Sequence, residues 1–162
     1  MNIKDFRRDF IQSVLEKLNE EKYVYKGYKF LLFKEEKEHL CYIYIYTHKG
    51  GDFIEIETKV YYSNKDIQSK LKLFEIIPYN EYICGGEIAS ISKNYLKKDF
   101  PERYSNLIYM VGEDISDIVD KWISLYKEII VPFFYDCSIP ENLNYIMNES
   151  DLFRTSTSVS YT

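Results

Sequence analysis

A regular alternation of side chains on either side of a glycine-containing turn strongly limits what this chain can fold into. Between Phe53 and Tyr62, aliphatic or threonine side chains occupy every second position, and charged or aromatic side chains occupy most of the others. Residues 40–47 alternate similarly. The segment His48–Asp52 between the two runs contains two adjacent glycines, which readily take the positive φ of a tight turn. The pattern predicts an antiparallel hairpin over residues 40–62.

This hairpin has one aliphatic face and one face of aromatic and charged residues. Successive side chains of a strand point to opposite sides, so the aliphatic residues of both strands share a face that we expect to lie against the core. The opposite face is expected to form an outer sheet surface rich in tyrosine and glutamate. Its members are Tyr42, Tyr44, Tyr46, Glu55, Glu57 and Tyr61.

Two segments show the apolar spacing of amphipathic helices. The first covers residues 3–22. The second covers about residues 114–131; it is expected to pack against the sheet and to stop at Pro132, because proline lacks the backbone N–H that continues a helix. A short final helix is predicted after Ser138, where Ser138 and Glu141 have the spacing of a capping box.

The remaining segments predict further strands, a short helix and loops. They are strands over residues 28–33, 84–91 and 107–111, a helix over residues 66–74, a charged turn over residues 34–38, and loops over residues 78–80 and 94–105. Either Asn64 or Asp66 is expected to begin the helix. The pair Gly85 and Gly86 indicates a bulge or a close backbone approach within its strand.

The order of these elements predicts one domain. A chain of 162 residues is long enough for a single core and short for two. A helix, antiparallel strands and then helices are typical of an α+β fold, with a single, mostly meandering antiparallel sheet. We expect the N-terminal helix and the long C-terminal helix to pack on one face of that sheet. The domain is predicted to span residues 1–149, followed by a flexible tail over residues 150–162 that is rich in serine and threonine.

Composition excludes several classes of protein. The formal net charge of -5 argues against a nucleic-acid binder, whose affinity comes mainly from basic residues on phosphates. No apolar run approaches the roughly 18 residues of a membrane span, and the N-terminus does not have the pattern of a signal peptide. Cys41, Cys84 and Cys137 are odd in number and widely spaced, which favours free thiols in a reducing cytoplasm.

Four short segments occur in the order seen in a known bacterial family. They are the helix start Phe6–Phe10, the strand entry Gly27–Phe30, the strand start Tyr82–Cys84, and the helix end Ile130–Phe134 with the short helix after it. On these segments the chain resembles, over residues 3–148, the family catalogued as domain of unknown function 4304. Residues 63–79 and the two adjacent glycines depart from it. The resemblance implies no catalytic residues. Some relatives are thought to lie near bacterial toxin and immunity genes, which implies an inhibitor role.

The sequence contains no recognisable catalytic or cofactor motif. It has no phosphate-binding glycine loop followed by lysine, no dinucleotide fingerprint, no nucleophile elbow and no zinc-protease helix. His39 and His48 are nine residues apart on one strand, roughly 30 Å when extended, so they are not expected to act together. We therefore predict no catalytic residues, no metal site and no cofactor.

The leading hypothesis is a non-enzymatic protein-binding module, in keeping with an immunity protein of a toxin system. Four acidic residues gather at the start of the long helix: Glu113, Asp114, Asp117 and Asp120. They match the positive end of the helix dipole, and they are also suited to steering a basic partner protein such as a toxin. No nucleic-acid or membrane partner is expected, and the oligomeric state is left open.

An alternative places the function on the outer sheet surface. Glu55 and Glu57 lie two residues apart on one strand face among tyrosines, as in a small hydrolase or a carbohydrate-binding domain. This hypothesis requires a deep pocket that converges on both glutamates.

Overall fold

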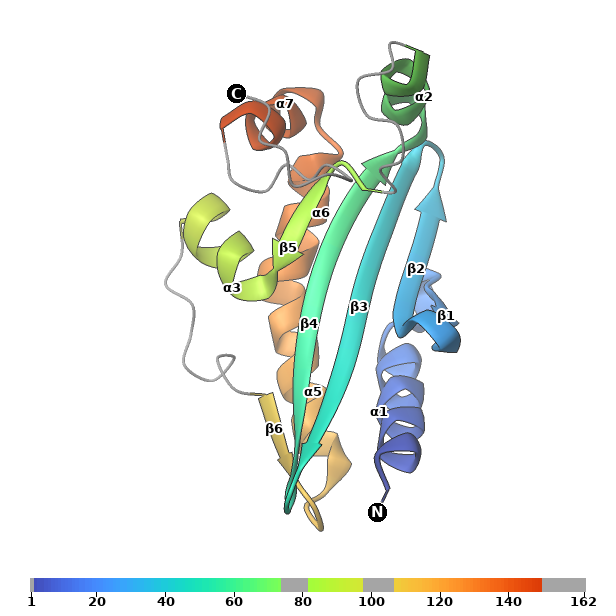
Figure 1. Ribbon diagram of the computed structural model, residues 1–162, viewed down its shortest axis with the longest axis vertical. Helices are drawn as coiled ribbons and strands as arrows, with labels where there is room; N and C mark the ends of the chain where they lie inside the picture. The colour runs from blue at the N-terminus through green and yellow to red at the C-terminus, as the bar shows by residue number, and fades with distance from the viewer. Residues whose placement is uncertain (1, 74–81, 98–106, 150–162) are drawn as a thin grey trace.

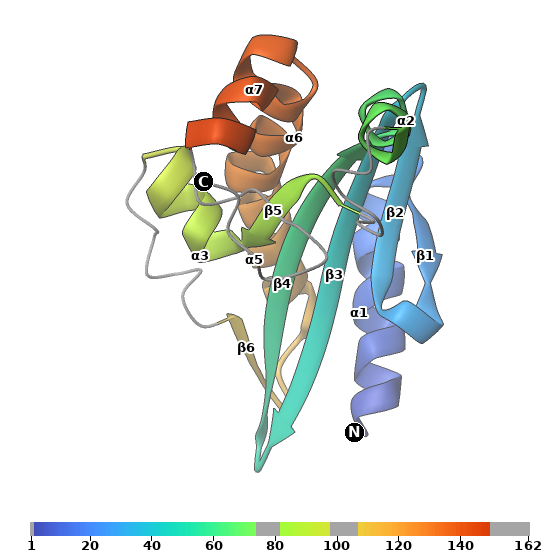
Figure 2. The same ribbon diagram turned by 45° about the horizontal axis from the view of Figure 1, so that its top comes forward.

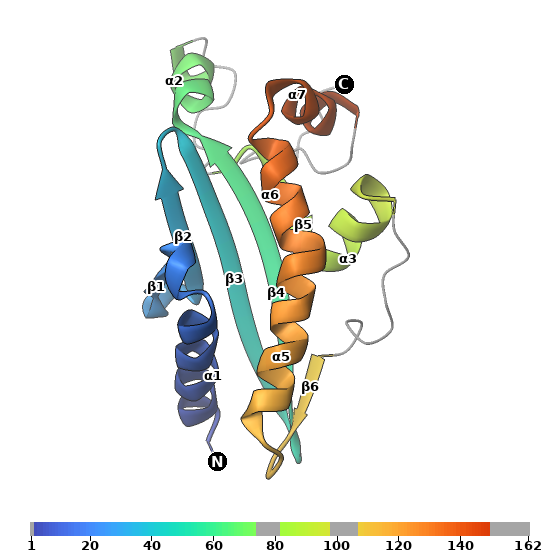
Figure 3. The ribbon, with the colours of Figure 1, turned by 180° about the vertical axis from the view of Figure 1, so that it is seen from behind.

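The computed structural model describes residues 2–73, 82–97 and 107–149 and has the α+β architecture expected from the sequence. One antiparallel sheet carries helices on one face, as Figure 1 and the view from behind in Figure 3 show. The predicted tail over residues 150–162, the loop at residues 78–80 and most of the loop over residues 94–105 lie outside the described residues.

Within the described residues, the sheet has six strands. They are β1 Val24–Lys26, β2 Leu31–Glu36, β3 His39–Gly50, β4 Phe53–Asn64, β5 Cys84–Glu87 and β6 Leu107–Met110. The first five follow one another across the sheet, and β6 pairs with β4 on the same edge as β5 but nearer the hairpin turn. Figure 2 shows β3 and β4 as the long central pair.

The predicted hairpin is confirmed, and it is longer than predicted. Strands β3 and β4 are paired residue by residue from His39 opposite Asn64 to Gly50 opposite Phe53. Their connection consists of Gly51, whose φ of 43° suits glycine, and Asp52. This hairpin is the longest pair in the sheet, and it places residues 39 and 64 at one end of the molecule and residues 50–53 at the other.

The helices lie before, between and after the strands. They are α1 Ile3–Lys17, α2 Lys65–Leu73, α3 Ile88–Ser90, α5 Ile115–Leu125, α6 Val131–Cys137 and α7 Pro140–Glu149. Two π-helical turns, Ile91–Tyr95 and Tyr126–Ile130, continue α3 and join α5 to α6. In Figure 3, α1 and the continuous α5–α6 rod lie side by side on the same face of the sheet.

The core fills the space between the sheet and these helices. Phe6, Phe10 and Trp122 have no exposed surface, and the Trp122 ring meets Phe10 edge-on. The Trp122 indole N–H donates to Thr58 Oγ1 at 3.0 Å, which satisfies the only polar group of that buried ring and joins α5 to β4. Both predicted apolar helix stripes therefore face the sheet.

The prediction that Pro132 stops the long helix is wrong, since residues 115–137 form one uninterrupted helical rod. The π-helical turn directly before Pro132 inserts an extra residue, and the Val131 N–H reaches back to the carbonyl of Tyr126. A proline inside an α-helix lacks one hydrogen bond and collides with the carbonyl four residues before it. The wider π turn gives the ring room, and α6 begins with this proline in its first turn.

Two strands start or end at other residues than the sequence predicted. The strand expected over residues 28–33 begins only at Leu31, because Gly27–Lys29 forms a 3-10 turn and Phe30 has a left-handed φ of 56°. The strand expected over residues 84–91 ends at Glu87, since β6 occupies the rest of that edge of β4. The chain then turns into α3. The glycine prediction is confirmed, because a Cβ on Gly85 would lie 2.1 Å from the carbonyl oxygen of Val60.

Three further predictions, all concerning where helices begin or end, were wrong. The first helix ends at Lys17 instead of residue 22, because a separate 3-10 turn follows and Lys22 has a left-handed φ of 62°. The capping box at Ser138 does not form, since the Ser138 hydroxyl donates to the carbonyl of Tyr135 at 2.6 Å and closes α6. Residues 91–95 are helical, so the loop predicted from residue 94 begins later.

Candidate functional site

The four predicted acidic residues lie just before α5 or in its first turns, and all are exposed. Asp114 is the N-cap, and its carboxylate accepts from the Ser116 N–H at 2.9 Å. This hydrogen bond holds the pKa of Asp114 below its usual value. Asp120 lies farther along the helix, 3.8 Å from the ammonium of Lys17 on α1. Glu113, Asp114 and Asp117 therefore form an acidic group at the N-terminal end of α5, before Asp120.

Exposed apolar side chains gather at the same end, which the sequence did not indicate. Phe53 pairs with Met110 across strands β4 and β6, and Ile108 lies opposite Glu55 in the same ladder. Val111 extends the ladder by donating its N–H to the Asp52 carbonyl at 2.8 Å. Between 38% and 44% of the surface of Phe53, Ile108, Met110 and Val111 remains accessible. Figure 1 shows this end, where β6 and the start of α5 flank the hairpin turn.

This end of the molecule is called the tip surface below. It consists of the apolar residues Phe53, Ile108, Met110 and Val111 and the acidic residues Glu113, Asp114 and Asp117. The backbone of Glu113 links the two groups, because its N–H donates to the Met110 carbonyl at 3.0 Å and its carbonyl accepts from the Tyr109 hydroxyl at 2.9 Å.

The tyrosine-rich face of the sheet is mostly closed to solvent. Tyr42, Tyr44 and Tyr61 lie on the outer face as expected, but each is at most 8% exposed. They form a second small core with Leu31, and Phe33, Leu40, Tyr46 and Tyr82 pack against it. The Tyr82 ring stacks on Tyr61, and its hydroxyl contacts that of Tyr44. These buried rings do not offer open stacking surfaces for a sugar.

The two glutamates of the alternative hypothesis do not converge on a cavity. Glu55 is exposed, while Glu57 contacts His48 at 3.0 Å and Lys59 at 3.6 Å. Three pockets formed by described residues include neither glutamate in their walls. The geometry thus gives no support for a paired-carboxylate hydrolase here.

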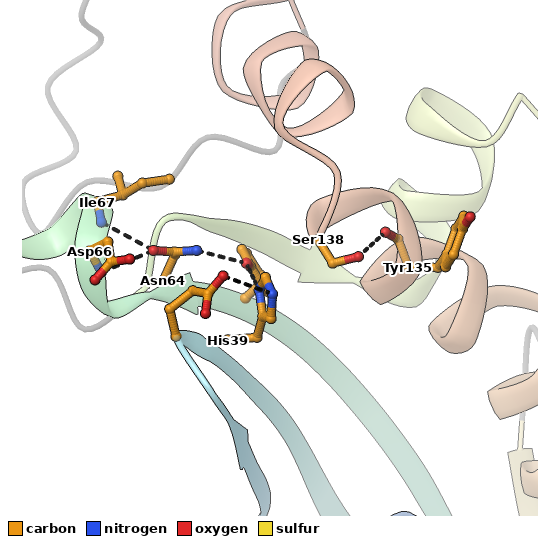
Figure 4. A network of polar contacts seen from close by, with 8 residues as sticks. His39, Asn64, Asp66, Ile67, Tyr135 and Ser138 are labelled. Atoms are coloured by element: carbon orange, nitrogen blue, oxygen red, sulfur yellow. Dashed lines mark hydrogen bonds and ion pairs between the residues drawn. The ribbon is translucent and has the colours of Figure 1, made fainter.

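His39 lies in a polar chain that the sequence did not reveal (Figure 4). Its Nδ1 is 2.6 Å from the Tyr62 hydroxyl, its Nε2 is 3.3 Å from Glu38, and the Asn64 side chain donates to Tyr62 at 3.3 Å. A neutral imidazole fits all three contacts when Tyr62 donates to Nδ1 and the ring proton on Nε2 faces the carboxylate. Asn64 Oδ1 in turn accepts from the N–H groups of Asp66 and Ile67, which begins α2.

Two small pockets adjoin His39 between the end of the sheet and the C-terminal helices. The first has a volume of about 220 Å³, and its wall includes Lys34, Cys41 and Tyr62. The second has a volume of about 230 Å³, and its wall includes Asn64, Cys137 and Leu143. His39 and Ser138 belong to both walls. Residues from distant segments, including β3, β4, α6 and α7, form the pocket walls, so periodicity along the chain could not predict them.

A larger and more open pocket of about 680 Å³ lies along α1. Its wall combines Arg7 and Arg8 with the apolar side chains of Ile11 and Leu15. The Arg7 guanidinium is held in place, because it donates to Thr47 Oγ1 and lies 4.4 Å from the centre of the Phe30 ring. Arg7 therefore has a structural role in joining α1 to the sheet.

The three cysteines are free thiols and come together in the core, although they are far apart in sequence. Cys41 and Cys84 lie on either side of Tyr62 in the β3–β4–β5 ladder. The sulfur of Cys137 on α6 is 3.8 Å from that of Cys84. Within the described ranges, no group of three or more histidine, cysteine or acidic side chains is placed to hold a metal ion.

Comparison with known proteins adds no family. Models of protein families, curated proteins and solved structures were all searched, and no match was found. In the part of the chain that the structure describes, no helix combines the length and apolar character needed to cross a bilayer. The resemblance to domain of unknown function 4304 stays a prediction.

Proposed function

We propose that this protein is a non-enzymatic binding module whose tip surface binds a basic partner protein. The observation that carries the proposal is the coincidence of exposed apolar side chains and acidic side chains at one end of the molecule. An exposed apolar patch with a polar rim is typical of a protein–protein contact surface. The resemblance to a family of which some members are thought to lie near toxin and immunity genes favours a toxin as this partner.

The two parts of the tip surface have different roles in this proposal. The apolar side chains of β4 and β6 supply the area that leaves water on binding. The carboxylates of Glu113 and Asp117 attract cationic side chains and speed the encounter. Because Asp114 is committed to capping α5, we assign the electrostatic contribution mainly to the other two.

Cross-linking in the cells that produce the protein tests this proposal. A photoreactive phenylalanine analogue at position 108 should give one discrete cross-linked product, containing a protein with an excess of lysine and arginine. The same analogue at Tyr28, which is 78% exposed and lies between β1 and β2, should not trap that protein. Equal trapping at both positions, or none at position 108, would contradict the proposal.

Binding of the trapped protein, once purified, tests the role of charge. The double variant Glu113→Lys/Asp117→Lys should weaken the affinity at least about tenfold, with most of the loss removed by high salt. The matched control Glu20→Lys/Glu141→Lys makes the same change of charge at exposed positions on η1 (Asn19–Glu21) and α7. It should change the affinity less than about twofold. Equal effects of both double variants would show that only net charge matters.

A further inference from the structure

The thiols of Cys84 and Cys137 form a close pair that joins two elements of the fold. Their sulfur atoms are 3.8 Å apart, one on β5 and the other at the C-terminal end of α6. A disulfide requires about 2.05 Å between the sulfurs, so the atoms must approach by roughly 1.8 Å to form one. Both residues are at most 1% exposed, so they can pair only with a thiol that is already beside them.

The two thiols differ in their access to small molecules. Cys137 belongs to the wall of the 230 Å³ pocket beside His39, together with Asn64 and Ser138. Cys84 is not part of that wall, and its sulfur is 3.8 Å from that of Cys137. A molecule of the size of a peroxide that enters this pocket meets Cys137 first.

We propose that Cys137 and Cys84 are an oxidation site, which a hydroperoxide converts to an internal disulfide. The Cys137 sulfur attacks one peroxide oxygen, the O–O bond breaks, and the products are a sulfenic acid on Cys137 and an alcohol or water. The Cys84 sulfur then attacks the sulfenic sulfur, and water leaves with the Cys84 proton. The peroxide is reduced by two electrons, and the two thiols together lose two electrons and two protons.

Cys41 is close by but is too far from Cys84 to form a disulfide with it. Cys41 and Cys84 are both paired with Tyr62, on opposite sides of β4, so two strand spacings separate them. This places their Cα atoms about 10 Å apart, beyond the roughly 7 Å limit of a disulfide. Cys41 therefore serves as an internal control.

Burial sets the expected rate of the reaction. Removal from water raises the pKa of the Cys137 thiol, so little of the reactive thiolate exists near neutral pH. Oxidation should consequently be slow at pH 7 and should accelerate about tenfold for each pH unit up to pH 9. An exposed cysteine of ordinary pKa would level off within this range.

Mass spectrometry of the intact wild-type protein tests the proposal without any variant. After treatment with hydrogen peroxide under native conditions, the protein should lose about two mass units, and digestion should yield a peptide pair that joins residues 84 and 137. Dithiothreitol should reverse the change. A pair containing Cys41, a sulfinic acid on Cys137 without a cross-link, or no change would overturn the proposal.

Single substitutions identify the resolving thiol. Cys84→Ala should leave Cys137 as a sulfenic acid that a dimedone probe captures, whereas Cys137→Ala should abolish the reaction. Cys41→Ala should form the cross-link as the wild type does. If Cys84→Ala and wild type gave equal dimedone capture and no cross-link, Cys84 would have no part in the reaction.

Discussion

At some positions of this protein, close contacts allow only one type of residue, and Gly85 is an example. At Gly85 the backbone of β5 passes so close to β4 that a Cβ would lie 2.1 Å from the Val60 carbonyl oxygen and 2.6 Å from the Tyr61 Cα. The residue also has a φ of 140°, which L side chains rarely adopt. The position of β5 on the sheet thus depends on the missing side chain.

The change Gly85→Ala should lower the free energy of unfolding by about 2–4 kcal/mol, since both strands must separate to admit the methyl group. The matched control is Gly51→Ala. Gly51 also has a positive φ, of 43°, but a Cβ there would meet nothing within 4 Å. It should cost only about 1 kcal/mol. Urea unfolding measures the free energy of unfolding of both variants. Similar losses of this free energy would show that backbone strain, not contact with β4, determines the need for glycine at position 85.

At the scale of the elements, side chains at strand and helix ends join neighbouring segments. Asn64 is the last residue of β4, and its Oδ1 caps α2 through two backbone N–H groups. Its Nδ2 also donates to the Tyr62 hydroxyl and so reaches the chain that contains His39. One side chain therefore links the start of α2 to the pocket wall.

The change Asn64→Ala should destabilise the protein by about 1–2 kcal/mol and should increase hydrogen exchange of the first α2 amides. Asn64→Asp keeps the capping oxygen and loses only the donor to Tyr62, so it should retain slow exchange in α2. Fast exchange in the aspartate variant would indicate that the Tyr62 contact, and not the cap, holds this helix.

At the scale of the whole molecule, the core contains many groups that ionise in alkali. Burial raises the pKa of the Cys41 thiol to about 12 and that of the Tyr126 hydroxyl to about 12. Burial also raises the pKa values of Tyr23, Tyr62 and Cys137. In the unfolded chain these groups ionise at their ordinary values, so alkali favours unfolding.

Stability should therefore be unaffected by these groups at pH 7 and should fall as the pH rises from about 9 towards 12, at up to about 1.4 kcal/mol per pH unit for each group. Cys41→Ala removes one such group and should make the decline less steep, whatever its effect at pH 7. Urea unfolding at pH 7, 9 and 10 measures both slopes. Parallel declines in the two proteins would contradict the contribution assigned to Cys41.

The spacing of apolar residues along the sequence was sufficient to predict most of the fold. The alternation around residues 51–52 determined the hairpin and its two faces, and the apolar stripes identified α1 and α5, because side-chain direction in a strand or helix follows directly from position. The acidic residues at the start of α5 were also evident from the sequence. The prediction that the helix ends at Pro132 was wrong because the π-helical turn before it cannot be recognised from the spacing of apolar residues.

The tertiary structure alone decided what the side chains meet. Sequence placed the tyrosines on the outer face, but only packing with Tyr82 and Leu31 shows that most of them are buried. Likewise, residues 39, 62 and 64, the thiols of Cys84 and Cys137, and the apolar half of the tip surface become neighbours through strand pairing. A linear sequence determines the direction of each side chain within its element, whereas contacts between distant segments depend on the register and docking of those elements in space.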